Sequence, residues 1–117
     1  MFDKSRVEIK YGPYGIVSAT ALDDPSLLPQ VQDYRRQLSS RMYPLDPDDI
    51  RRKLPDSEYF VSRKFDGEFS VLVFRSGEVF SLNPGGTIRV GMPWQEEARQ
   101  RLIDADIGDV AIAGELY

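Results

Sequence analysis

The feature that most constrains the fold is residues 59–82, where apolar and polar positions alternate around a turn at Ser76-Gly77. A period of two is typical of β-strands, and a Ser-Gly pair between two such runs is typical of a hairpin. The middle run is apolar on both faces, which indicates a central strand. We therefore expect three consecutive antiparallel strands: Tyr59 to Phe65, Phe69 to Phe74 and Glu78 to Leu82.

The flanking segments combine further strands with helices. A hairpin is predicted at the N-terminus by its turn signal, and caps and apolar spacing of three and four residues indicate helices. The expected order is a hairpin of residues 6–9 and 16–20, helices over 26–38 and 46–54, a strand at 87–90, a helix from Pro93 and a last strand at 110–116. The predicted fold class is therefore α+β, an antiparallel sheet with flanking helices.

Composition excludes several kinds of chemistry. The 117 residues include no cysteine and no histidine, which rules out disulfide partners, thiolate metal sites, a Ser-His triad and the usual zinc sites. No apolar run is long enough for a membrane, and residues 1–5 lack the apolar core of a signal peptide, so we expect no membrane partner and a cytoplasmic location. The net charge of −4 argues against autonomous nucleic-acid binding, and we interpret the basic clusters at 35–36 and 51–53 as solvated helix faces.

Lys64-Phe65-Asp66-Gly67 is a candidate covalent site. A lysine amine is a nucleophile only when it is neutral, so it needs burial or nearby positive charge to lower its pKa. Gly67 would let the backbone come close to a ligand. On the last predicted strand, Glu115 shares a face with two alanines, where its carboxylate has room to accept hydrogen bonds from ribose hydroxyls.

Three stretches together resemble the ATP-dependent DNA and RNA ligases, which are covalent nucleotidyltransferases. They are Lys64-Phe65-Asp66-Gly67, Phe80-Ser81-Leu82-Asn83 and Gly114-Glu115-Leu116, and the resemblance covers about Glu58 to Tyr117. It implies a partial nucleotidyltransferase (ATP-grasp-like ligase) domain. Residues 1–57 are then an N-terminal hairpin and helices of unknown role, and residues 58–117 are the N-terminal part of an adenylylation domain.

The resemblance also implies a reaction. Lys64 attacks the α-phosphorus of ATP, forms lysyl–AMP and expels pyrophosphate, with Mg²⁺ neutralising the phosphates. AMP then passes to the 5′-phosphate of a DNA or RNA end, and a 3′-hydroxyl displaces it. Ser62 corresponds to a position that reads adenine, and Asp66, Gly67 and Glu115 would bind the nucleotide.

Two positions depart from the family pattern. Phe69 stands where DNA ligases usually carry a ribose-contacting arginine, which favours the RNA-ligase side, and Leu82 stands where the family has a phosphate-contacting arginine. Arg89 is either a substitute for that arginine or a surface residue.

The family's later motifs, an acidic metal-binding residue and a pair of lysines, are not found before Tyr117, and no metal ligand is assigned. We therefore expect the remainder of the ligase domain to be missing from this chain, and the 117 residues alone not to seal nicks. Two alternatives stay open: a non-catalytic interaction module, and a capping-type nucleotidyltransferase that uses GTP.

Overall fold

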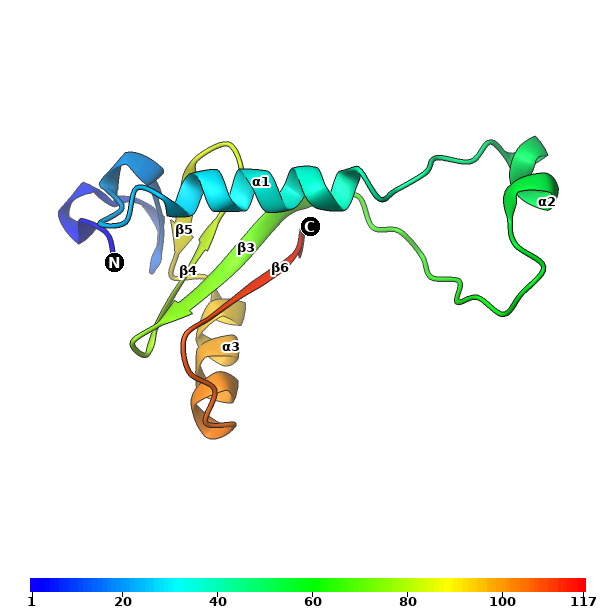
Figure 1. Ribbon diagram of the computed structural model, residues 1–117. Coiled ribbons are helices and arrows are strands. Elements are labelled where there is room, and N and C mark those ends of the chain that lie inside the picture. The colour runs from blue at the N-terminus through cyan, green and yellow to red at the C-terminus, as the bar shows by residue number, and fades with distance from the viewer.

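The computed structural model describes all 117 residues and is organised around one six-stranded antiparallel sheet (Figure 1). Its order is β1-β2-β5-β4-β3-β6, so β3 lies between β4 and β6, and β6 forms one edge. The strands are β1 (Glu8–Tyr11), β2 (Tyr14–Ser18), β3 (Glu68–Arg75), β4 (Glu78–Leu82), β5 (Thr87–Val90) and β6 (Val110–Leu116). The sheet joins both halves of the chain, because β2 pairs with β5.

The helices are α1 (Leu27–Ser39), α2 (Ile50–Lys53) and α3 (Pro93–Asp104). Short 3-10 turns occupy Lys4–Arg6, Ala19–Ala21 and Pro47–Asp49. The α+β class, the antiparallel sheet and the flanking helices are confirmed. None of the helices combines the length and the apolar character needed to span a membrane.

The two long helices lie on opposite faces of the sheet, as Figure 1 shows. Adjacent residues on a strand point to opposite faces, and β4 shows both environments. Leu82 packs in the apolar cluster that includes Leu27 and Val31 of α1, whereas Ser81 accepts a hydrogen bond from Gln95 of α3. We call these the α1 face and the α3 face.

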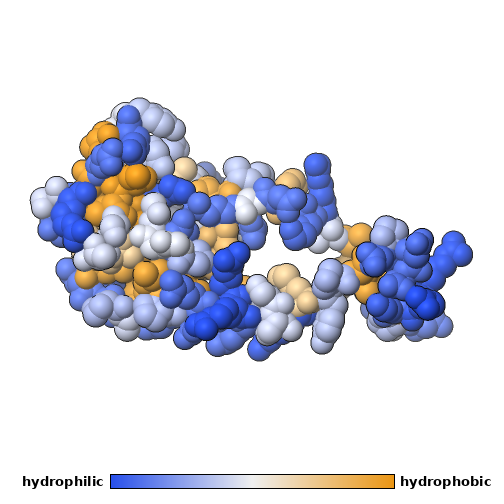
Figure 2. All heavy atoms as spheres, turned by 90° about the horizontal axis from the view of Figure 1, so that it is seen from above, coloured by the Kyte–Doolittle hydropathy of each residue, from blue (hydrophilic) through white to orange (hydrophobic).

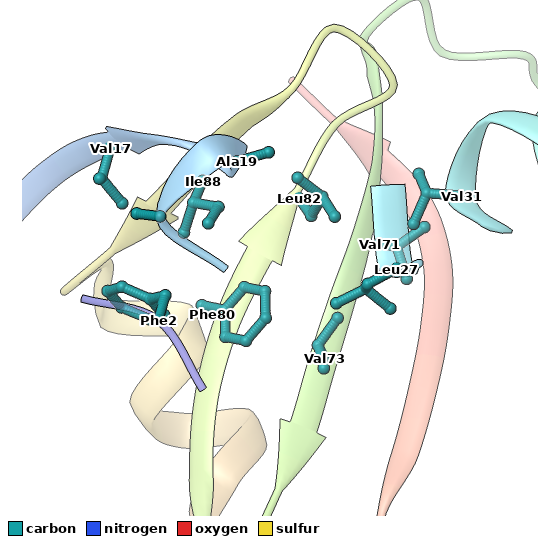
Figure 3. Packing of buried hydrophobic residues seen from close by; sticks show 11 residues of the cluster. Phe2, Val17, Ala19, Leu27, Val31, Val71, Val73, Phe80, Leu82 and Ile88 are labelled. Carbon is teal, nitrogen blue, oxygen red and sulfur yellow. The ribbon is translucent and has the colours of Figure 1, made fainter. Parts of the chain in front are cut away.

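The core lies on the α1 face, over the centre of the sheet (Figure 3). Leu82 and Ile88 are fully buried and Phe80 is 1% exposed. Phe2 reaches over from the N-terminus and packs edge-on against Phe80, with ring centroids 5.4 Å apart. Burying one such side chain contributes about 1.5–3 kcal/mol, so this cluster holds the central strands together.

Helix α1 covers the sheet through one narrow stripe. Leu27 and Val31 are buried at i and i+4, as the helical spacing predicts. Ser26 precedes the helix, but its hydroxyl does not cap it; the Asp24 carboxylate instead accepts hydrogen bonds from the Ser26 backbone N–H and hydroxyl. The C-terminal half of α1, which includes the half-exposed Tyr34, continues beyond this buried stripe toward the edge of the sheet.

The strand expected over Tyr59 to Phe65 is not formed, and that prediction was wrong. These residues are exposed and irregular, and Phe60 is fully exposed. The prediction required this segment to pair with the strand that follows it, and both sides of that strand, β3, are taken by β4 and β6. The other two predicted strands of this stretch are present as β3 and β4.

Residues 40–67 leave the body of the protein between α1 and β3 and carry only the 3-10 turn Pro47–Asp49 and the short helix α2 (Figure 1). Figure 2 shows open space between the two limbs of this excursion and a largely hydrophilic tip. At the tip, Arg52 and Lys53 both form ion pairs with Asp49. The returning limb ends at Gly67, where it meets the sheet.

Candidate functional site

A groove of about 420 Å³ lies between the C-terminal half of α1 and the β3–β6 margin of the sheet. It contains four of the predicted site residues: Lys64, Asp66, Gly67 and Glu115. Two segments far apart in the sequence therefore meet at one place. Ser62 does not line this groove.

Glu115 reaches the groove because of its register on β6. It is paired with Phe69, and Ala113 is paired with Val71, a core residue of the α1 face. Glu115 lies two positions after Ala113 and so points to the same face. The small side chain of Ala113 leaves the space that the groove occupies.

Lys64 is held by Asp66 in an exposed ion pair. Its Nζ donates a hydrogen bond to Asp66 Oδ1 at 2.7 Å, and its side chain is 81% exposed. The hydrogen bond and charge of Asp66, with a smaller contribution from Glu115, raise the pKa of Lys64, and the same pair lowers the pKa of Asp66. The amine of the free protein is therefore protonated at neutral pH, and it becomes a nucleophile only after this pair opens.

Gly67 is required by the close approach of two chain segments. A Cβ at this position would lie 2.5 Å from the backbone oxygen of Leu116, which no side chain tolerates. Phe65 stacks on Tyr117 beside it, with ring centroids 4.8 Å apart. Gly67 was expected to allow the close approach of a ligand, and here it allows the close approach of β6. The contact attaches residues 64–67, which we call the lysine loop, to the strand that carries Glu115.

The Ser81-Leu82-Asn83 stretch lies outside the groove. Ser81 is buried on the α3 face and accepts a hydrogen bond from Gln95 Nε2 at 2.7 Å. Asn83 closes the turn to β5, because its Oδ1 accepts from the backbone N–H of Thr87 at 2.8 Å. These contacts give both residues a structural role.

Arg89 does not substitute for the missing arginine in the groove. Its guanidinium donates to both carboxylate oxygens of Glu68 at 3.0 Å and to the Tyr14 hydroxyl at 3.3 Å. It pairs with Ser81 across the strands and so lies on the α3 face. Only 21% of its side chain is exposed, so it is not a surface arginine either.

Helix α1 contributes one wall of the groove, which the sequence did not indicate. Tyr34, Arg35 and Leu38 line the groove opposite the lysine loop. Tyr34 and Leu38 are four residues apart and continue the apolar spacing of the helix, which was the available signal. Arg35 was interpreted as part of a solvated helix face, because its neighbour in the groove cannot be read from the local sequence.

No cluster of three or more acidic side chains that could hold a metal ion is present. The groove offers two carboxylates, Asp66 and Glu115, and the first is paired with Lys64. Magnesium is usually bound by one or two carboxylates together with substrate phosphates. These residues therefore do not form a metal site by themselves, and we treat Mg²⁺ as part of a nucleotide substrate.

Comparison with known proteins identifies no relative. No family model matches the chain, and no curated protein and no solved structure is detectably similar to it.

Proposed function

We propose that this chain is the nucleoside-binding part of an ATP-dependent polynucleotide ligase, with Lys64 as the residue that is adenylylated. The observation that supports this most is the shared groove, in which Lys64, Asp66 and Gly67 meet Glu115 on the α1 face. The resemblance of the three sequence stretches supplies the reaction, and the groove supplies a place for it.

In the proposed step, the neutral Nζ of Lys64 attacks the α-phosphorus of ATP. An N–P bond forms, the bond between the α-phosphorus and the bridging oxygen breaks, and pyrophosphate leaves with that electron pair. The attacking nitrogen releases its proton to solvent. Mg²⁺ bound to ATP neutralises charge on the phosphates.

The other groove residues would bind and position the nucleotide. Glu115 has its carboxylate in the groove and would accept hydrogen bonds from the ribose hydroxyls. Asp66 would hold Lys64 in place while the groove is empty, and ATP binding would have to separate the pair. Ser62 lies outside the groove, so adenine contact by Ser62 would require the lysine loop to move.

The AMP acceptor in this proposal is the 5′-phosphate of a DNA or RNA end. The −4 net charge argues that nucleic-acid affinity would come from other parts of a complete ligase, including its later motifs.

Labelling with α-³²P-ATP and Mg²⁺ tests the proposal in this chain and in any longer protein that contains it. Label should appear on the protein through a bond that is acid-labile and alkali-stable, as a P–N bond is. Lys64→Ala should abolish it, and Lys64→Arg should not restore it, because a guanidinium stays protonated. Lys53→Ala is the matched control, since Lys53 is paired with Asp49 at the distant tip.

The outcomes separate the alternatives. Undiminished labelling of Lys64→Ala would refute the assignment of this lysine. Labelling by GTP in preference to ATP would indicate a capping-type enzyme, and no labelling of either protein would favour a non-catalytic module. Glu115→Ala should weaken labelling without erasing it, because it removes a binding contact and leaves the nucleophile.

A further inference from the structure

The groove contains two cationic side chains that differ in one respect. Lys64 is neutralised by Asp66 at 2.7 Å, whereas Arg35 of α1 forms no ion pair and no side-chain hydrogen bond. Asp66 is paired with Lys64, so Glu115 is the remaining carboxylate in the groove. Arg35 is thus the one cation in the groove that is available to an anionic ligand.

Seven of the eleven arginines form an ion pair or a side-chain hydrogen bond, and Arg35, Arg41, Arg51 and Arg63 form neither. Arg36, the next residue on α1, pairs with Asp33, and Arg89 pairs with Glu68 on the opposite face of the sheet. An arginine that stabilises the fold is expected to be engaged in this way. Arg35 is exposed and, like Arg41 and Arg51, needs no partner for the fold, but unlike them it lines the groove, where its guanidinium is available to a ligand.

The position of Arg35 on α1 also bears on how phosphate could bind. It lies in the C-terminal half of α1, where the helix dipole places partial negative charge and the free backbone groups are carbonyls. The helix itself therefore offers no free N–H donors to phosphate here. Attraction of phosphate to this wall of the groove has to come from a side chain.

We propose that Arg35 binds the phosphate groups of the nucleotide, an inference that rests on the proposed function of the same groove. Its planar guanidinium presents five N–H donors that match phosphate oxygens. Leu82 stands at the position where the ligase pattern has its phosphate-contacting arginine, so that strand does not supply this contact. Arg35 lines the groove from α1 and Glu115 lines it from β6, so in this proposal the phosphates lie toward the helix and the ribose toward the strand.

Equilibrium binding of ATP and of adenosine to the purified chain tests this role. Arg35→Gln should weaken ATP binding by about tenfold or more, because a charge-assisted hydrogen bond is lost, and should leave adenosine binding within about twofold. Arg36→Gln is the matched control on the neighbouring position and should change neither. Arg35→Lys should recover part of the ATP affinity, because lysine keeps the positive charge but lacks the planar set of N–H donors of a guanidinium.

Several results would overturn the inference. ATP binding unchanged in Arg35→Gln would show that the guanidinium does not contact phosphate. An equal loss of ATP and adenosine, or a lowered melting temperature, would assign Arg35 a structural role, and a wild-type chain that binds neither ligand would leave no phosphate site for it. If Lys64→Ala abolishes labelling while Arg35→Gln binds ATP normally, the proposed function stands and only the role of Arg35 fails.

Discussion

The two neighbours of β3 differ in what covers them. On one side, β4 is packed between the core and α3, and Leu82 is completely buried. On the other side, β6 is the edge strand, most of its residues are exposed, and 47% of Ile112 is accessible. Both strands pair with β3 over their whole length. Hydrogen bonding therefore builds the sheet on both sides of β3, but only the β4 side is covered by packed side chains. We call the β4 side the closed side and the β6 side the open side.

The difference explains where the candidate site lies. The buried stripe of α1 ends before the helix does, and the remaining half of α1 stands over the β6 margin with a groove beneath it. An enclosed strand leaves no room for a ligand, while an edge strand with small side chains does. We expect substitutions on the β4 side to act on stability and those on the β6 side to act on binding.

Leu82→Ala tests the closed side and should have the largest effect on folding. Removing a fully buried leucine side chain should lower the free energy of unfolding by about 2 to 5 kcal/mol, through lost burial and a cavity. Ile112→Ala on β6 is the control and should cost less than about 1 kcal/mol. Urea denaturation followed by tryptophan fluorescence measures both, and equal losses would contradict the comparison.

Gln95→Ala tests the polar part of the same side. Gln95 is 1% exposed, and it donates to the Ser81 hydroxyl and to the Arg89 backbone oxygen while its own oxygen accepts from the backbone N–H of Met92. Its loss leaves buried groups unpaired, so we expect a cost of about 1 to 3 kcal/mol. Gln100→Ala, on the exposed side of α3, serves as control and should be close to neutral. An unchanged free energy of unfolding in Gln95→Ala would mean that water makes the hydrogen bonds that Gln95 made.

Glu68→Gln should have a smaller effect, because Glu68 is more exposed. It removes the charge that pairs with Arg89, and we expect a loss of about 1 kcal/mol or less. The loss should shrink as salt is added, which thermal unfolding at two ionic strengths measures. Glu97→Gln breaks a more exposed pair with Arg101 and should change less. A loss as large as that of Gln95→Ala would place Glu68 within the closed side.

Asp66→Asn tests the open side and should leave stability almost unchanged. Asp66 raises the pKa of Lys64, so the variant should bring the pKa of that amine down toward its ordinary value. Because the raised pKa belongs to the folded state, any stability from the pair is present below the pKa of the unfolded lysine and is lost as the pH rises through the folded pKa. An NMR titration of the lysine side chains measures the shift, and an unchanged pKa for Lys64 would mean that the pair is not formed in solution.

Local sequence predicted most of the elements, because their signals do not depend on distant residues. The hairpin turn at Ser76-Gly77, the apolar spacing of α1 and the proline that begins α3 all lie where the sequence indicated. The strand at 59–65 was predicted by the same alternation that predicted β3. Alternation reports a preference for extended backbone, and it does not report whether a neighbouring strand is free to pair.

Only part of the candidate site could be predicted from the sequence. Lys64, Asp66, Gly67 and Glu115 could be named from short motifs, whereas Arg35 could not, since nothing near it in the sequence distinguishes it from Arg36. Gly67 was predicted to let the backbone come close to a ligand, whereas in the structure it lies against the backbone of Leu116.

By itself, the sequence determined most of the helices and strands, which residue types exist for chemistry, and the absence of cysteine and histidine. Only the tertiary structure decided that β6 takes the free edge of β3, that Arg89 is tied to Glu68 on one face and that Arg35 is left unpaired on the other. Backbone preference and side-chain periodicity are local properties, so they can be read along the chain. Edge occupancy and ion pairing are settled by competition among residues distant in sequence, and that competition exists only once the sheet has formed.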